Sequence, residues 1–295
     1  MAQDIRDMPS IGHDDVIGLN FIRNPCPYVF RRHFRQGLRS HIMEVLNPAH
    51  IQKEADGTVI DGRRWYPRAR PLRIFRIFRT RLKTLANALD EIGRVKILEH
   101  YLAPVFLAGS EEFVVDYAGP DGREIILCGF QEFVEGEILD PWSALDPADL
   151  MATMYDRLHG DRSPSGADRT RWIDDARAMA ALFIARIKQM IAESKHLPDL
   201  AGVGNLVMVA SGEIKLVDLN NISGVSLDTD ILLDDRGYPV CDKSIEALAL
   251  LERNLLNRPV DTGEAIYRKF LDPRRMKEVK DLEAAFYRSR PIRHS

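Results

Sequence analysis

The sequence predicts an α+β protein with a smaller N-terminal part, built of a sheet and one main helix, and a larger, mostly helical C-terminal part. Short β-branched and aromatic runs bounded by turn residues cluster before residue 135, and helical periodicity dominates after it. Between them, Glu135-Gly136-Glu137 breaks the last strand pattern. We therefore expect an N-terminal domain over residues 1–134 and a C-terminal domain over residues 135–295.

The composition is that of an ordinary globular protein, with 45% apolar and 29% charged residues among 295. A net charge of -3 gives no general indication of a nucleic-acid partner, and no apolar run approaches the roughly 20 residues of a membrane span. Cys26, Cys128 and Cys241 lie far apart, which argues against a disulfide framework or a zinc site. These features predict a cytoplasmic protein.

The first strands are expected between residues 20 and 66. Residues 1–20 are polar and lack strong periodicity, so we expect them to be mobile or loosely packed. Cys26 to Phe34 predicts a strand and Leu38 to Leu46 a short helix. Asp56-Gly57 and Asp61-Gly62 flank a short β-branched run, which predicts a hairpin.

A basic run follows, with no acidic residue between Gly62 and Leu89. It is typical of a phosphate- or RNA-binding segment, and equally of the solvated face of a strand and helix. Interleaved apolar residues indicate that it also packs against a core. Its basic residues are Arg63, Arg64, Arg68, Arg70, Arg73, Arg76, Arg79, Arg81 and Lys83.

The main N-terminal helix is predicted over about residues 78–102, where leucine, isoleucine and valine recur at steps of three and four and Pro104 follows. Two strands should then flank the turn from Gly119 to Gly122. In the C-terminal part, Asp146 suits the N-cap of a helix that ends near Leu158. Further helices are predicted from the stripe Trp172, Ala176, Met179, Phe183, Ile187 and Met190, and over residues 244–252 and 274–288.

The stretch from Leu197 to Asn221 carries the main candidate site. Asp199 and Asn205 share a glycine-containing loop, an apolar hairpin follows, and Asp218 stands where its second strand ends. Three oxygen-bearing side chains should thus gather at one end of a hairpin, which suits Mg²⁺ and a hydroxyl nucleophile beside a phosphate. Each residue alone also fits a turn or a strand end.

The order of these parts resembles the protein-kinase-like fold, in particular atypical bacterial kinases and small-molecule kinases of the aminoglycoside and choline kinase type. The resemblance covers most of residues 57–255. It implies that Asp199 is the catalytic base and that Asn205 and Asp218 hold Mg²⁺. It also implies a hinge from Phe130 to Gly136 that contacts the adenine of ATP through Glu132, Phe133 and Val134.

The resemblance further implies that the main helix supplies a glutamate to a phosphate-positioning base. Glu91 is the first choice and Glu99 the weaker one. Asp242, at the start of a later helix, would brace the catalytic loop from below. The base itself is normally a lysine, but only arginines occur at the expected distance, and Arg73 stands 18 residues before Glu91.

Other departures from the kinase pattern bear on activity. Five residues rather than four separate Asp199 from Asn205, His196 stands one step too early, and Leu219-Asn220 replaces the usual Phe-Gly. No glycine-rich loop occurs in residues 1–70. His159-Gly160-Asp161 copies the His-Gly-Asp of antibiotic kinases, but its place in the chain favours a helix-end turn.

Three functions are therefore expected, in this order. The first is an ATP- and Mg²⁺-dependent phosphotransferase with an unknown acceptor. The second is an inactive or weak pseudokinase that serves as a binding module. The third is an RNA- or anionic-lipid-binding protein that uses residues 62–89, with nucleic acid the less favoured partner. The acidic segment from Ser223 to Tyr238 either attracts a cationic acceptor or is a solvated loop.

Overall fold

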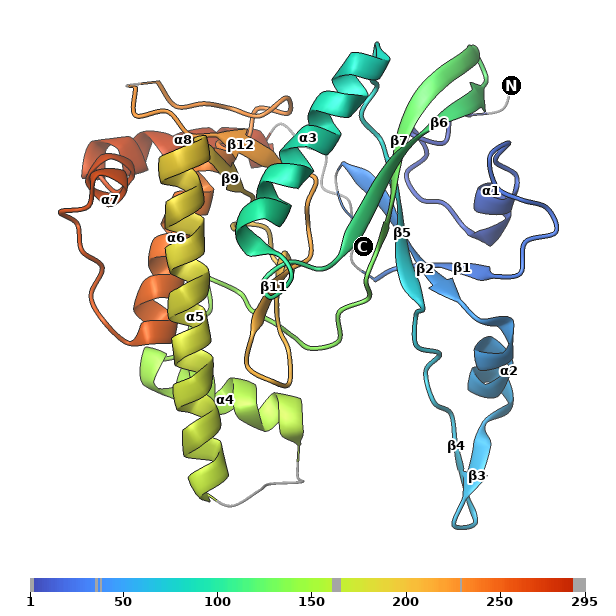
Figure 1. Cartoon of the computed structure of the whole chain (residues 1–295), viewed down its shortest axis with the longest axis horizontal. Coiled ribbons are helices and arrows are strands. Elements are labelled where there is room, and N and C mark those ends of the chain that lie inside the picture. The colour runs from blue at the N-terminus through green and yellow to red at the C-terminus, as the bar shows by residue number, and fades with distance from the viewer. Residues whose placement is uncertain (1–2, 35–36, 38, 161–165, 229, 289–295) are drawn as a thin grey trace. The chain divides into compact units, whose positions relative to one another are not determined.

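The chain forms two compact units in the computed structural model, which describes residues 3–34, 37, 39–160, 166–228 and 230–288 (Figure 1). The first unit comprises Met1–Arg94 and Ala108–Phe133, and the second comprises Val95–Leu107 and Val134–Ser295. This division differs from the expected one at residues 95–107. They belong to the second unit because Leu98, Leu102 and Phe106 are buried in its core.

The first unit is built around one antiparallel sheet with the strand order β1-β2-β5-β7-β6, and β3 and β4 form a separate hairpin. The predicted strands around residues 26–34, 56–66 and 110–131 are confirmed. Its elements are α1 (His13–Ile17), β1 (Val29–Arg32), β2 (Ser40–Leu46), α2 (Pro48–Asp56), β3 (Thr58–Ile60), β4 (Arg63–Trp65), β5 (Arg73–Phe78), the start of α3 (Leu85–Leu102), β6 (Ser110–Gly119) and β7 (Gly122–Gln131).

The helix predicted over residues 38–46 is wrong, because this stretch is strand β2. It pairs with β1 on one edge and β5 on the other, and nearly all of its side chains are buried. A short apolar run buried on both faces has no period that separates strand from helix. Pairing with distant strands therefore decides its conformation.

The first residues are also more ordered than predicted. Ile5, Ile11 and Val16 are buried in the core of the first unit, and the Arg6 side chain is fully buried. The Arg6 guanidinium pairs with Asp4 at 2.6 Å and with Glu124 of β7 at 2.5 Å. These long-range ion pairs hold a segment that has no periodicity of its own.

Helix α3 begins at Leu85 rather than near residue 78. Phe78 is still part of β5, where it pairs with Ser40, and the Thr84 hydroxyl accepts the amide N–H of Asn87 at 3.2 Å as a cap of the first turn. The apolar stripe is buried only from Ala88 onward, since Leu85 is exposed. The helix itself is confirmed, and its start lies later.

The second unit is mostly helical, as predicted. Asp146 caps α4 as expected, since its carboxylate accepts the Ala148 N–H at 2.8 Å. No helix in the described part of the chain is long and apolar enough to cross a membrane. Its further elements are β8 (Glu137–Ile138), α4 (Pro147–His159), α5 (Gly166–Ser194), β9 (His196–Pro198), β10 (Leu206–Met208), β11 (Ile214–Leu216), β12 (Ile222–Gly224), α6 (Val240–Leu256), α7 (Ala265–Phe270) and α8 (Pro273–Arg288).

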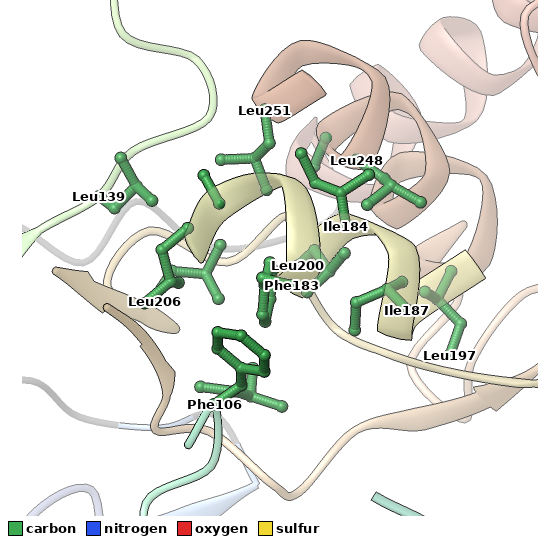
Figure 2. Packing of buried hydrophobic residues seen from close by; sticks show 14 of the residues in the cluster. Phe106, Leu139, Phe183, Ile184, Ile187, Leu197, Leu200, Leu206, Leu248 and Leu251 are labelled. Atoms are coloured by element: carbon green, nitrogen blue, oxygen red, sulfur yellow. The ribbon is translucent and has the colours of Figure 1, made fainter. Parts of the chain in front are cut away.

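Helix α5 runs through the core of this unit. Phe183, Ile184 and Ile187 lie among leucines of the β9–β11 region and of α6, as Figure 2 shows. The predicted stripe is confirmed, because Ala176, Phe183, Ile187 and Met190 have no exposed surface. Each large side chain of this kind contributes about 1.5–3 kcal/mol by burial. The core therefore fixes the strands that carry the polar residues described next.

Candidate active site

The Asp199 loop leaves strand β9, which pairs with β12. The Asp199 N–H donates to the carbonyl of Asn221 at 3.0 Å, and its Oδ1 accepts the N–H groups of Ala201 and Gly202 at 3.0 and 3.1 Å. Leu197 and Leu200, on either side, are fully buried against α5 (Figure 2). The carboxylate is therefore held at a turn between two core anchors.

Asn205 and Asp218 come from the two strands of the β10–β11 hairpin. The Val217 N–H donates to the Asn205 carbonyl at 2.8 Å, which places Asn205 beside the end of β11, where Asp218 follows. The Asn205 side-chain amide donates to the Asp199 carbonyl at 2.8 Å. Asp199, Asn205 and Asp218 therefore meet at one end of the hairpin, the juxtaposition that the sequence predicts.

The charges at this site are unbalanced. Burial, and to a lesser extent the negative charge of Asp218, raise the pKa of Asp199 to about 6, although the two loop N–H groups act in the opposite direction. Among the described residues, neither carboxylate forms an ion pair with Lys, Arg or His. A bound cation would relieve this repulsion.

The donor set fits a hard divalent cation only with help from other ligands. In the described ranges, no group of three or more His, Cys, Asp or Glu side chains could hold a metal ion. The candidate set is two carboxylates and one amide, of which the Asn205 NH₂ is already engaged and Oδ1 is the ligating atom. Mg²⁺ accepts few protein ligands and keeps water or phosphate oxygens for the rest, so these residues suit Mg²⁺ better than a metal that needs an all-protein cage.

The loop is braced by residues that the sequence did not indicate. The Leu200 N–H donates to the hydroxyl of Ser244 in α6 at 3.1 Å, and the Trp142 indole N–H donates to the Ala201 carbonyl at 3.2 Å. Nothing in the sequence separates this serine or this tryptophan from ordinary core residues. Asn221, whose carbonyl and side chain both contact Asp199, could have been noted because it follows Asp218-Leu219-Asn220.

The bracing role expected of Asp242 is wrong. Its carboxylate pairs instead with Arg275 of α8, with Nε–Oδ1 at 2.5 Å and Nη2–Oδ2 at 3.1 Å. Both side chains are buried. Ser244, two residues later, supplies the contact with the loop, because the same turn of α6 presents both residues to different neighbours.

In the first unit, Arg73 and Glu132 lie together. The pairing of Ile74 with Gln131 places them beside each other where β5 begins and β7 ends. Both line a cavity of about 470 Å³, together with Leu72, Gly109, Ser110 and Glu111. An exposed arginine at the rim of a cavity is a suitable phosphate contact.

The predicted hinge has an uneven supply of hydrogen-bonding groups. The Glu132 N–H donates to the Gly109 carbonyl at 2.8 Å, and its carboxylate accepts the Gly109 N–H at 3.2 Å. Within the described ranges, the backbone groups of Phe133 and Val134 form no hydrogen bond. Phe133 and Val134, rather than Glu132, therefore have donors and acceptors for an adenine ring.

The glutamates of α3 are engaged on their own helix. Glu91 pairs with Arg94 at 3.2 Å, and Glu99 pairs with Lys96 at 2.7 Å. No ion pair joins Glu91 to Arg73 among the described residues. Glu91 therefore does not brace Arg73 in this structure.

Arg76 forms the buried ion pair of the first unit's sheet that the sequence did not reveal. Its guanidinium contacts Glu112 of β6 at 2.5 Å and the Ser110 hydroxyl at 2.8 Å. The alternation of Arg-Ile-Phe-Arg-Ile-Phe hides it, because residues 73 and 76 face opposite sides of the strand. One arginine of the basic run is thus a core residue.

The His-Gly-Asp motif is a helix end, as predicted. His159 is the last residue of α4, and Gly160 has φ of 60° and donates to the Asp156 carbonyl at 2.9 Å. Asp161 lies outside the described residues. The acidic segment after Ser223 contains ordinary turn chemistry, since the Asp234 carboxylate accepts the N–H groups of Arg236 and Tyr238.

Comparison with models of known protein families found no match, and comparison with curated proteins found none either. The interpretation of the site therefore depends on its geometry and chemistry.

Replacing Gly202 by alanine is expected to disturb Asn205. A Cβ at position 202 would lie 2.4 Å from the Asn205 Nδ2 and 2.8 Å from its Oδ1. The amide would have to move away from the Asp199 carbonyl, at a cost of about 1–3 kcal/mol. Urea denaturation would measure this loss. Gly224→Ala is the control, because nothing lies within 4 Å of a Cβ there, and equal stability of the two variants would contradict the packing described.

Proposed function

We propose that the chain is an Mg²⁺- and ATP-dependent phosphotransferase of the kinase-like type. The observation that carries this proposal is the convergence of Asp199, Asn205 and Asp218 at one hairpin end, with two carboxylates that no cationic side chain of the described residues neutralises. Asp199 would orient the acceptor hydroxyl and accept its proton. Asn205 and Asp218 would hold Mg²⁺.

The chemistry suits these residue types. Phosphoryl transfer depends mainly on positioning and on neutralisation of the phosphate charge, which Mg²⁺ supplies when it is bound. A carboxylate with a pKa of about 6 is largely ionised at neutral pH, and it is a stronger base than an ordinary aspartate. The two loop N–H groups that bind Asp199 Oδ1 keep the carboxylate in one orientation.

The nucleotide contacts proposed for the first unit are Arg73 and the hinge. Arg73 lines the cavity of about 470 Å³ and would contact a phosphate. Phe133 and Val134 would bind adenine through their backbone, whereas the Glu132 N–H is already bonded to Gly109. Arg76 is excluded from nucleotide contact because Glu112 and Ser110 hold it inside the sheet.

Calorimetry with a non-hydrolysable ATP analogue tests this proposal. We expect binding that needs Mg²⁺ and that Asp218→Ala weakens by about 10- to 100-fold, as is usual when a metal site loses a group that tunes it. Asp228→Ala, which removes an exposed carboxylate from the same unit, should leave binding unchanged. Binding that ignores both Mg²⁺ and Asp218→Ala would refute the metal assignment.

A pseudokinase is the second candidate, and a specific observation favours it. Glu91 pairs with Arg94 on its own helix, so the base–glutamate pair that positions phosphates in active kinases is not formed among the described residues. Nucleotide binding without transfer of radiolabelled phosphate would support this candidate. Transfer that depends on Asp199 would exclude it.

A further inference from the structure

The β3–β4 hairpin is a separate, projecting part of the first unit. Figure 1 shows it extending from α2 away from the five-stranded sheet. Asp61 and Gly62 form its two-residue turn with φ of 49° and 74°, the positive values that a tight hairpin turn requires. The hairpin is therefore well formed although its strands pair only with each other.

The root of the hairpin is fixed. The Arg64 guanidinium donates to the Asp56 carbonyl at 3.1 Å, and the Ala69 N–H donates to Glu54 at 2.9 Å. Arg68 pairs with the buried Glu44 of β2 at 3.0 Å. The strands thus leave the unit in a defined direction, and the free end is held out as a rigid element.

The free end exposes large apolar side chains on both of its faces. In the antiparallel register, Thr58 pairs with Trp65 and Ile60 with Arg63, which places Ile60 and Trp65 on one face and Val59 on the other. Val59, Ile60 and Trp65 are 61%, 54% and 55% exposed, and the following Tyr66 is 63% exposed. Such a cluster on a rigid element indicates a contact surface.

Positive charge surrounds this apolar end. Arg63, Arg64, Arg68 and Arg70 are exposed, and from Gly62 to Leu89 no acidic residue occurs. By contrast, Arg76 and Arg81 of the same basic run are paired with Glu112 and with Asp4 and Asp7. The basic run therefore divides into a structural half in the sheet and an exposed half at the hairpin.

We propose that the β3–β4 hairpin docks on an anionic membrane surface. Val59 and Ile60 would enter the boundary between headgroups and acyl chains, Trp65 and Tyr66 would lie at the level of the headgroups, and the arginines would contact lipid phosphates. Asp61 at the turn limits the depth of insertion. Single-stranded RNA fits less well, because it stacks on aromatic rings along a groove, whereas here aliphatic side chains cover both faces of a narrow ribbon.

Vesicle flotation with the full chain tests this proposal. We expect binding to phosphatidylcholine vesicles that contain phosphatidylserine, little binding to pure phosphatidylcholine, and weakening at high salt. Arg63→Gln with Arg64→Gln, and separately Ile60→Ser with Trp65→Ala, should each reduce the partition coefficient by at least about tenfold. Because all four side chains are exposed, circular dichroism should show unchanged folding.

Matched variants elsewhere on the surface serve as controls. Arg171→Gln with Arg186→Gln removes the same charge from exposed positions of α5, and Leu89→Ser removes an equally exposed aliphatic side chain from α3. Neither should change vesicle binding. Equal loss in the controls, absence of vesicle binding, or salt-sensitive binding of a labelled RNA oligomer without vesicle binding would each overturn the membrane assignment.

Discussion

Asp199→Asn is expected to reduce phosphotransfer turnover by about 10²- to 10⁴-fold, the usual loss when a general base is removed. The variant keeps the shape of the side chain, and its Oδ1 can still accept the N–H groups of Ala201 and Gly202. The loss should therefore be in kcat rather than in nucleotide affinity. Single-turnover transfer from radiolabelled ATP would measure it, with Asp228→Asn as the control for loss of a distant carboxylate.

The same variant should be more stable than the wild type at neutral pH when metal is removed by a chelator. Burial and Asp218 raise the pKa of folded Asp199 to about 6, whereas the unfolded chain has an ordinary aspartate pKa near 3.9. A raised carboxyl pKa stabilises the folded state fully below about pH 4, and this contribution is lost as the pH rises through 6. The stability advantage of Asp199→Asn should thus grow by about 2 kcal/mol between pH 4 and pH 7.

Chemical denaturation at the two pH values would measure this difference, and Mg²⁺ should shrink it by neutralising the pair. A variant that loses activity but gains stability separates a functional carboxylate from a structural one. If Asp199→Asn destabilised the chain equally at both pH values, Asp199 would be a structural turn residue, and the catalytic proposal would lose its support.

The sequence predicts those features whose cause is local. The cap at Asp146, the turn at Asp61-Gly62 and the stripe along α5 all have periodic or turn-forming patterns, and the structure contains each of them. The convergence of Asp199, Asn205 and Asp218 is predictable for the same reason, since a short hairpin brings its own ends together.

Features that depend on distant partners were not predictable in this way. Strand β2 is specified by its neighbours β1 and β5, and the N-terminal segment is held by the pair between Arg6 and Glu124, 118 residues apart. Arg76 and Arg63 belong to one basic run, yet only the sheet decides that the first is buried. Spacing along the chain does not show which residue meets which partner across a core.

Asp242→Ala is expected to destabilise the chain by about 3–5 kcal/mol, because it leaves Arg275 buried without its counter-charge. The guanidinium contacts both carboxylate oxygens of Asp242, and it lies 4.8 Å from the Phe270 ring, where water cannot replace the lost partner. The pair also joins the first turns of α6 and α8. Urea denaturation at neutral pH would measure the loss.

Removing both partners should be far less damaging than removing one. In Asp242→Ala with Arg275→Met, no buried charge remains and the methionine can pack on Phe270, so we expect most of the lost stability to return. Asp281→Ala, which breaks the exposed Lys277–Asp281 pair on the same helix α8, should have little effect, because solvent screens that pair. If the double variant were as unstable as Asp242→Ala alone, the carboxylate would be needed for a contact other than Arg275. The bracing role that the sequence suggested for Asp242 would then be open again.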